Sequence, residues 1–150
     1  MKILYVTSPW NGFLDLICRG KSEAAGMPSF VYPLKEMITK RGFLIDFAIV
    51  IKEPKNLNIG AEWLMNSSYF WVSDKSFLKI PTILKIIQKG NYDFIYGQGG
   101  GGEWGNFASI LAHKPFGMRY YGTFLAQHLD DNYFRFFRRD ILSSFVYNLP

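Results

Sequence analysis

The residues KILYVT, numbers 2–7, decide how the rest of the chain is interpreted. This short run of apolar and β-forming residues is typical of a strand that is buried on both faces of a parallel sheet. It is followed by Met27–Arg41, whose apolar residues have helical spacing, and by a second apolar run, Phe43–Val50 (FLIDFAIV). Together these segments predict one strand-loop-helix-strand unit with a right-handed crossover.

The same alternation continues along the chain. Further strands are expected at Ser67–Val72, Tyr92–Tyr96 and Phe116–Tyr120, helices at Phe77–Lys89, Glu103–His113 and Asp131–Tyr147, and loops at Ser8–Gly26 and Gly97–Gly102. Strands that alternate with helices predict a three-layer α/β/α Rossmann-like domain with a mostly parallel sheet. A length of 150 residues suits a single domain spanning 1–150.

The composition narrows the classes of function. The aromatic share of 18% exceeds what one small core needs, so some rings are expected to line a cleft, an interface or a membrane-facing patch. One cysteine, Cys18, and two histidines favour a reducing, cytoplasmic location and no metal site. The net charge of +5 permits an anionic partner. Because this charge is modest and the sequence has no RNA-binding signature, nucleic-acid binding is disfavoured.

The carboxyl edge of the predicted sheet is where a ligand is expected, because open parallel sheets bind ligands outside the carboxyl ends of their strands. Three segments leave strands at that edge: Ser8–Gly26, Gly97–Gly102 and Tyr121–His128. These segments also hold the unusual residues of the chain, so the sequence predicts one site built from all three.

The glycine run is the sharpest local signal. Gly97, Gly99 and Gly102 fit G-x-G-x-x-G, but the run lies late in the chain and no acidic residue follows about 20 positions on, which disfavours dinucleotide binding. We favour a loop that brings backbone N–H groups close to a ligand. Glu103 would then begin a helix and accept hydrogen bonds from sugar hydroxyls. The alternative is a tight turn in which Glu103 only caps the helix.

Two further positions suit an anionic ligand, each with an ordinary alternative. Gly26 opens the Met27 helix, and its place fits either an anion site or a plain N-cap. Arg119 lies on or beside a buried strand, which predicts either a cleft-facing guanidinium or a salt bridge. His113 is expected to end a helix and interact with its dipole.

The segment Tyr133–Arg139 mixes aromatic and basic residues, as helices at a membrane interface do. This predicts a peripheral membrane contact. The alternative, which we favour, is a helix that buries the stripe formed by Phe134, Phe137, Ile141 and Phe145 and leaves its arginines in water.

These motifs, in this order, resemble the N-terminal, acceptor-side domain of retaining glycosyltransferases with the GT-B fold (group 1, or family 4). KILYVT followed by GMPSFVYPLKEMITKRGFLIDFAIV is similar to the family's opening unit. YDFIYGQGG is similar to its later strand, and KPFGMRYYGTF to its P-x-v-x-r-x-h-G strand and loop. The likeness covers nearly the whole chain.

The resemblance implies transfer of a hexose from a nucleotide-sugar to a hydroxyl acceptor in glycan, glycolipid or polysaccharide synthesis, with no separate cofactor. It implies that Gly26 and Met27 lie on the donor-phosphate side. Candidates for the acceptor side are Gln98, Gly99, Gly100, Glu103, Arg119, Gly122 and Thr123.

The catalytic residue stays unassigned, with Glu103, Tyr121 and His128 as candidates. Tyr121 stands where the family often has a histidine. The resemblance also implies a donor-binding domain or partner subunit beyond residue 150, without which the chain is expected to be inactive. The alternative is a non-catalytic Rossmann-type module that binds a nucleotide or docks a partner.

Overall fold

The structure is a computed structural model that describes residues 1–23, 31–75 and 78–119. The elements in chain order are β1 (Lys2–Thr7), α1 (Asn11–Cys18), α2 (Val31–Thr39), β2 (Leu44–Ile51), the 3₁₀ turn η1 (Glu62–Leu64), β3 (Tyr69–Ser73), α3 (Lys79–Gly90), β4 (Phe94–Gln98), α4 (Gly99–Leu111) and β5 (Phe116–Arg119).

The sheet has the order β3-β2-β1-β4-β5, and every pairing in it is parallel. The chain therefore begins in the central strand, moves outward through β2 and β3, and then returns to build β4 and β5 on the other side. Reversal of direction at the first strand is the arrangement of Rossmann-like folds. The predicted three-layer α/β/α architecture is confirmed.

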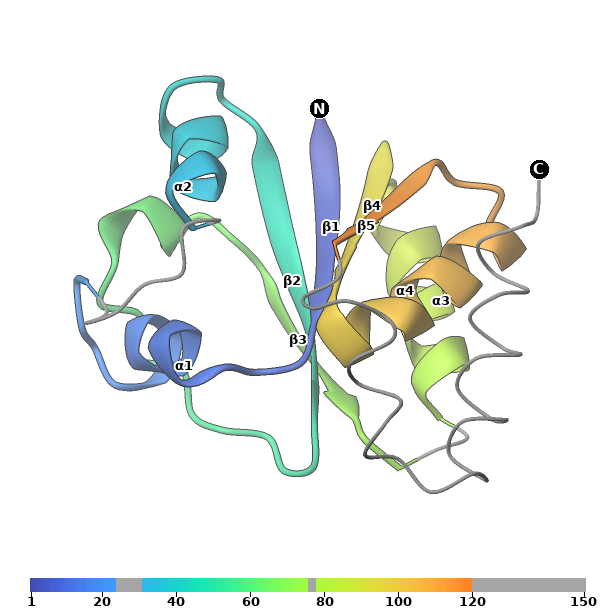
Figure 1. The fold of residues 1–150 in the computed structure, drawn as a ribbon, viewed down its shortest axis with the longest axis horizontal. Helices are drawn as coiled ribbons and strands as arrows, with labels where there is room; N and C mark the ends of the chain where they lie inside the picture. The colour runs from blue at the N-terminus through green and yellow to red at the C-terminus, as the bar shows by residue number, and fades with distance from the viewer. Residues whose placement is uncertain (24–30, 76–77, 120–150) are drawn as a thin grey trace, which may run out of the picture.

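Helices cover the two faces of the sheet as separate layers, α1 and α2 on one face and α3 and α4 on the other (Figure 1). Alternate residues of β1 serve the two cores: Tyr5 packs with Phe47 towards α1 and α2, whereas Leu4 and Val6 pack towards α3 and α4. Ring centroids of Tyr5 and Phe47 lie 5.5 Å apart. The central strand is thus buried from both sides, as its sequence predicted.

The predicted loop Ser8–Gly26 is wrong over its first half, which contains α1. Phe13, Leu16 and Ile17 are fully buried on one face of this helix. Their spacing of three and four residues is helical, and packing against the sheet stabilises a helix of only eight residues despite the polar residues and glycines around it.

The other predicted elements are present with shifted ends. Helix α3 buries Ile83 and Ile87, and Leu84 is half-buried against the same core. Gly90 is the last residue of α3, and Asn91 takes the left-handed conformation that ends it, with φ of 48°. The predicted helix Asp131–Tyr147 and residues 27–30 of the predicted Met27–Arg41 helix lie outside the described residues.

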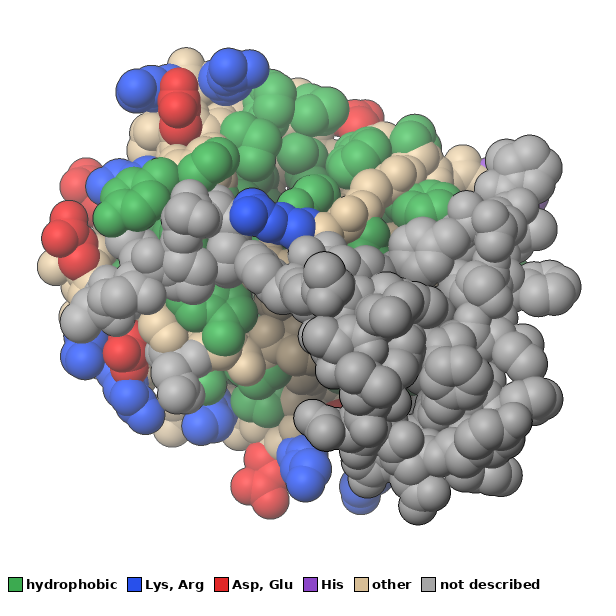
Figure 2. Space-filling view, in the orientation of Figure 1, with side chains coloured by type: hydrophobic (Ala, Val, Ile, Leu, Met, Phe, Trp, Pro, Cys, Tyr) green, Lys and Arg blue, Asp and Glu red, His purple; other side chains and the backbone are tan. Residues whose placement is uncertain are grey.

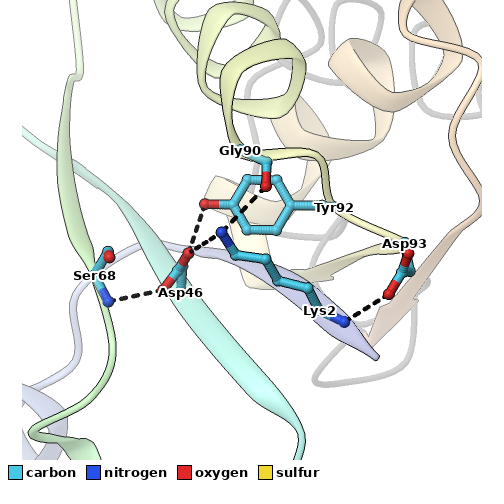
Figure 3. A network of polar contacts seen from close by, with 6 residues as sticks. All are labelled: Lys2, Asp46, Ser68, Gly90, Tyr92 and Asp93. Atoms are coloured by element: carbon cyan, nitrogen blue, oxygen red, sulfur yellow. Dashed lines mark hydrogen bonds and ion pairs between the residues drawn. The ribbon is translucent and has the colours of Figure 1, made fainter.

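A buried polar network joins the strands at their amino ends (Figure 3). The Asp46 carboxylate on β2 accepts hydrogen bonds from the Tyr92 hydroxyl and from the Ser68 backbone N–H, both at 2.8 Å. Lys2 Nζ lies 3.4 Å from the same carboxylate and donates to the Gly90 carbonyl at 3.1 Å. The charge of Asp46 is therefore both paired and hydrogen-bonded, and its contacts connect β2 with β1 and with the residues that precede β3 and β4. We assign this edge of the sheet a structural role.

Candidate functional site

The carboxyl edge of the sheet brings together residues that are far apart in the sequence. Thr7 is in register with Gln98, and Gln98 with Arg119, so the ends of β1, β4 and β5 lie side by side. Ser8 follows Thr7 at this edge, and Gly99 and Gly100 follow Gln98. Two of the three segments predicted to meet at this edge therefore start next to each other, and the third, Tyr121–His128, starts two residues after Arg119 in the sequence and lies outside the described residues.

The glycine run forms less of a loop than predicted. Gly97 belongs to β4, and Gly99–Gly102 form the first turn of α4, so the prediction of a loop up to residue 102 and a helix starting at Glu103 is wrong. Gly99, with φ of +60°, makes the whole reversal from strand to helix. Only glycine adopts that conformation without strain, which explains how the connection can be so short.

Close packing explains three of the glycines. A Cβ on Gly101 would lie 2.5 Å from the carbonyl carbon of Thr7, and one on Gly102 would lie 2.6 Å from the carbonyl carbon of Gly97. A Cβ on Gly105 would lie 2.8 Å from Cβ of Val6. The missing side chains let α4 lie directly against β1 and β4, so these glycines serve the fold.

Gly99 and Gly100 differ, because a Cβ on either would meet nothing within 4 Å. Gln98 makes no side-chain cap to the N-terminus of α4, whose 13 residues point their N–H groups and positive dipole end towards the same edge. Glu103 lies one turn further into the helix and is half-buried, so its predicted place at the helix start is wrong. The open backbone patch at Gly99 and Gly100 suits an anionic or hydroxyl-bearing group.

Arg119 ends β5 with an exposed side chain and lines a cavity of about 440 Å³. This position fits the cleft-facing interpretation made from the sequence, and the alternative of a salt bridge stays a prediction. Burial raises the pKa of the neighbouring Tyr96, and the positive charge of Arg119 offsets part of that rise. The guanidinium therefore acts electrostatically on the cavity wall as well as on the carboxyl edge.

The cavity lies on the face of the sheet that carries α2 and was not located from the sequence. Its walls are largely apolar and include Ile3, Tyr5, Met37, Phe94 and Tyr96. Figure 2 shows this side of the molecule, where hydrophobic side chains gather beside α2 and around the beginnings of β1 and β4. The high aromatic content was the signal that some rings line a cleft, but only the register of β1 and β4 shows which ones.

Several candidates lie away from the edge or outside the described residues. Cys18 is half-buried on α1, and burial raises the pKa of its thiol, which disfavours a nucleophilic role. His113 follows the other end of α4, with φ of 51°. The predicted residues Gly26, Met27, Tyr121, Gly122, Thr123 and His128, and the segment Tyr133–Arg139, are outside the described ranges.

Within residues 1–23, 31–75 and 78–119, no cluster of three or more His, Cys, Asp or Glu side chains is placed to hold a metal ion. In the same ranges, none of the helices has the length and apolar character that crossing a membrane requires. Comparison of the chain with protein-family models, with curated proteins and with solved structures found no match. The case for function therefore depends on the geometry of the carboxyl edge and on the motifs described above.

Proposed function

We propose that the chain is the acceptor-side domain of a GT-B glycosyltransferase, which moves a sugar from a nucleotide-sugar to a hydroxyl acceptor. One observation carries this proposal: the open backbone at Gly99 and Gly100 lies between Ser8 and Arg119 at the carboxyl edge of a Rossmann-like sheet. In such sheets this edge is where ligands bind. The motifs that resemble the glycosyltransferase family supply residues to the same edge.

Each part of the edge has a role in this proposal. The uncovered backbone of Gly100 lets a bulky sugar ring approach the first turn of α4, and the N–H groups of that turn donate to its oxygens. Gln98 and Glu103 are the candidates to orient the acceptor hydroxyls. Arg119 supplies positive charge on the acceptor side of the edge, beside Gln98.

The proposed reaction needs little acid-base chemistry from these residues. The acceptor oxygen forms a bond to the anomeric carbon while the bond from that carbon to the diphosphate oxygen breaks. The proton of the acceptor hydroxyl passes to an oxygen of the leaving diphosphate. The work of the domain is then to hold the acceptor in line and to stabilise charge that develops on the leaving group.

A second candidate is a non-catalytic module that binds an anionic ligand. The N-terminus of α4, where Gln98 provides no side-chain cap, lies near Arg119 and favours this candidate, because that arrangement suits a phosphate whether or not a reaction follows. The two proposals differ in what they require besides the anion. A glycosyltransferase must also bind a neutral saccharide at Gly100, whereas an anion-binding module need not.

An NMR titration of the isotope-labelled chain separates these alternatives. Methyl glycosides of glucose, galactose, mannose and N-acetylglucosamine are added one at a time, and uridine diphosphate is added in a parallel series. The proposal expects at least one glycoside to shift the amide signals of Gly99, Gly100 and Ser8, and Gly100→Val to abolish that shift. A response to the diphosphate alone supports the anion-binding module, and no response to any glycoside contradicts the glycosyltransferase proposal.

A further inference from the structure

We propose that the apolar cavity beside α2 binds an amphipathic anion, namely a hydrocarbon chain whose phosphate or carboxylate head group is held by Arg119. The volume of about 440 Å³ lies in the range of small-molecule sites, roughly 300–1,000 Å³. Binding at this cavity does not depend on the proposed function. If that function holds, the same geometry makes the acceptor a lipid-linked one.

The walls of the cavity fix the chemistry of the ligand tail. Ile3 and Tyr5 from β1 face Phe94 and Tyr96 from β4 in register, and the Tyr5 and Tyr96 rings lie 5.2 Å apart. Arg119 is the one charged side chain among the described residues that line the cavity. A sugar or nucleotide inside it would lose its hydration without recovering hydrogen bonds, whereas a hydrocarbon chain loses nothing.

The position of Arg119 fixes the direction of the ligand. Arg119 lies at the carboxyl edge, in register with Gln98, while Ile3 and Phe94 pair near the beginnings of their strands. A ligand with its head group at Arg119 and its hydrocarbon tail at Ile3 runs along the length of four strand residues. At 3.3 Å per residue, the distance from head to tail is about 13 Å. A guanidinium can bind phosphate or carboxylate through two parallel N–H groups, which a neutral head group cannot exploit.

The tail end of the cavity is open to longer chains. Met1 lines it with an exposed side chain, and its carbonyl accepts a hydrogen bond from the Leu44 backbone at 3.1 Å. Ile45, the next residue of β2 after Leu44, also lines the cavity near this end. Met37, in the wall, has a flexible thioether that adapts to ligands of different shape.

Isothermal titration calorimetry with ligands of one chain length tests the proposal. Decyl phosphate, decanoate, decyl maltoside and decyltrimethylammonium are each used below their critical micelle concentrations. We expect the two anions to bind more tightly than the neutral and cationic ligands, and the comparison of phosphate with carboxylate identifies the preferred head. Arg119→Gln should weaken decyl phosphate by about tenfold and leave decyl maltoside unchanged. Arg41→Gln, an exposed arginine beyond α2, is the control.

The tail is tested separately by filling the cavity. Met37→Trp should reduce binding of every decyl ligand, whereas Met65→Trp, at an exposed position after η1, should not. Nuclear Overhauser contacts between the decyl protons and the Phe94 and Tyr96 rings give a readout in the unmodified chain. Equal affinity for anion and cation, no effect of Arg119→Gln, or binding to anionic vesicles without binding to monomeric decyl phosphate would each overturn the proposal.

Failure of this proposal and failure of the proposed function are distinguishable. If the protein binds decyl phosphate but responds to no methyl glycoside, the amphiphile site is supported and the glycosyltransferase proposal is contradicted. If a glycoside shifts the Gly100 signal but the protein binds no decyl ligand, the proposed function is supported and the proposal of a lipid-linked acceptor is contradicted.

Discussion

Gly101 in the first turn of α4 packs directly against the end of β1, because a Cβ at position 101 would lie 2.5 Å from the carbonyl carbon of Thr7. Its neighbour Gly100 has open space in the same place. We expect Gly101→Ala to lower the free energy of unfolding by about 1–3 kcal/mol, since the helix must move off the sheet.

Gly100→Ala is the matched control for that substitution. It adds the same methyl group one residue earlier, where it should raise stability by about 0.5–1 kcal/mol, because glycine is disfavoured inside helices. Urea unfolding followed by circular dichroism measures both variants. Equal losses from the two substitutions would mean that α4 is not seated on β1 as described.

Substitutions of Gly99 test the effect of backbone conformation alone, because an added side chain would meet no neighbouring atoms. The φ of Gly99 is +60°, yet no atom lies within 4 Å of a Cβ at this position. Gly99→Ala should therefore cost about 1–2 kcal/mol through the left-handed conformation alone. Gly99→Asn should cost less, because asparagine tolerates that conformation better than alanine. If both variants match the parent chain in urea, the strand-to-helix turn does not require φ of this sign.

The hydroxyl of Tyr92 should make stability depend on alkaline pH. Burial, followed by the hydrogen bond to Asp46 and the negative charge of that residue, raises the pKa of Tyr92 above its ordinary value of 10.0. Between that value and the folded-state pKa, the unfolded chain loses this proton while the folded chain keeps it. Stability is therefore fully present below pH 10 and falls by about 1.4 kcal/mol per pH unit above it.

Tyr92→Phe should remove that contribution to the slope and cost about 1.5–3 kcal/mol at neutral pH, the worth of a hydrogen bond to a charged group. Tyr32→Phe, at an exposed site, is the control. Urea unfolding between pH 7 and 11 checks both. An unchanged slope in Tyr92→Phe would show that its phenol ionises equally in the folded and unfolded chains.

Cys18 should be a poor nucleophile in the folded chain. Burial raises its thiol pKa, so the reactive thiolate is scarce near neutral pH. We expect iodoacetamide at pH 8 to modify the native chain about tenfold more slowly than the chain in urea. Native reaction as fast as in urea would show that burial does not suppress the thiolate of Cys18.

The sequence predicted the fold class because β1 and β2 are apolar runs long enough to identify without tertiary information. It failed at α1, where Asn11, Gly12 and Asp15 concealed the helical spacing of Phe13, Leu16 and Ile17. Eight residues give a weak periodic signal, and this helix owes its stability to the sheet beneath it.

The sequence predicted that the candidate site lies at the carboxyl edge of the sheet, but not which residues lie next to each other there. Gln98 and Arg119 were identified as site residues, but their adjacency depends on β5 pairing with β4, which local patterns do not encode. For the same reason, the glycines at 101, 102 and 105 could not be distinguished from those at 99 and 100. Their difference is the distance to Thr7, Gly97 and Val6, and that distance exists only once α4 lies on the sheet.

The central place of β1 also has a consequence for biosynthesis. During synthesis β1 can pair with β2 as soon as that strand emerges from the ribosome, but its other edge has no partner until Phe94–Gln98 has emerged as well. Throughout that interval the nascent chain carries an unprotected apolar strand edge, the kind that recruits chaperones or aggregates. Emergence of residue 98 from the ribosome is therefore the step that lets both edges of β1 be paired.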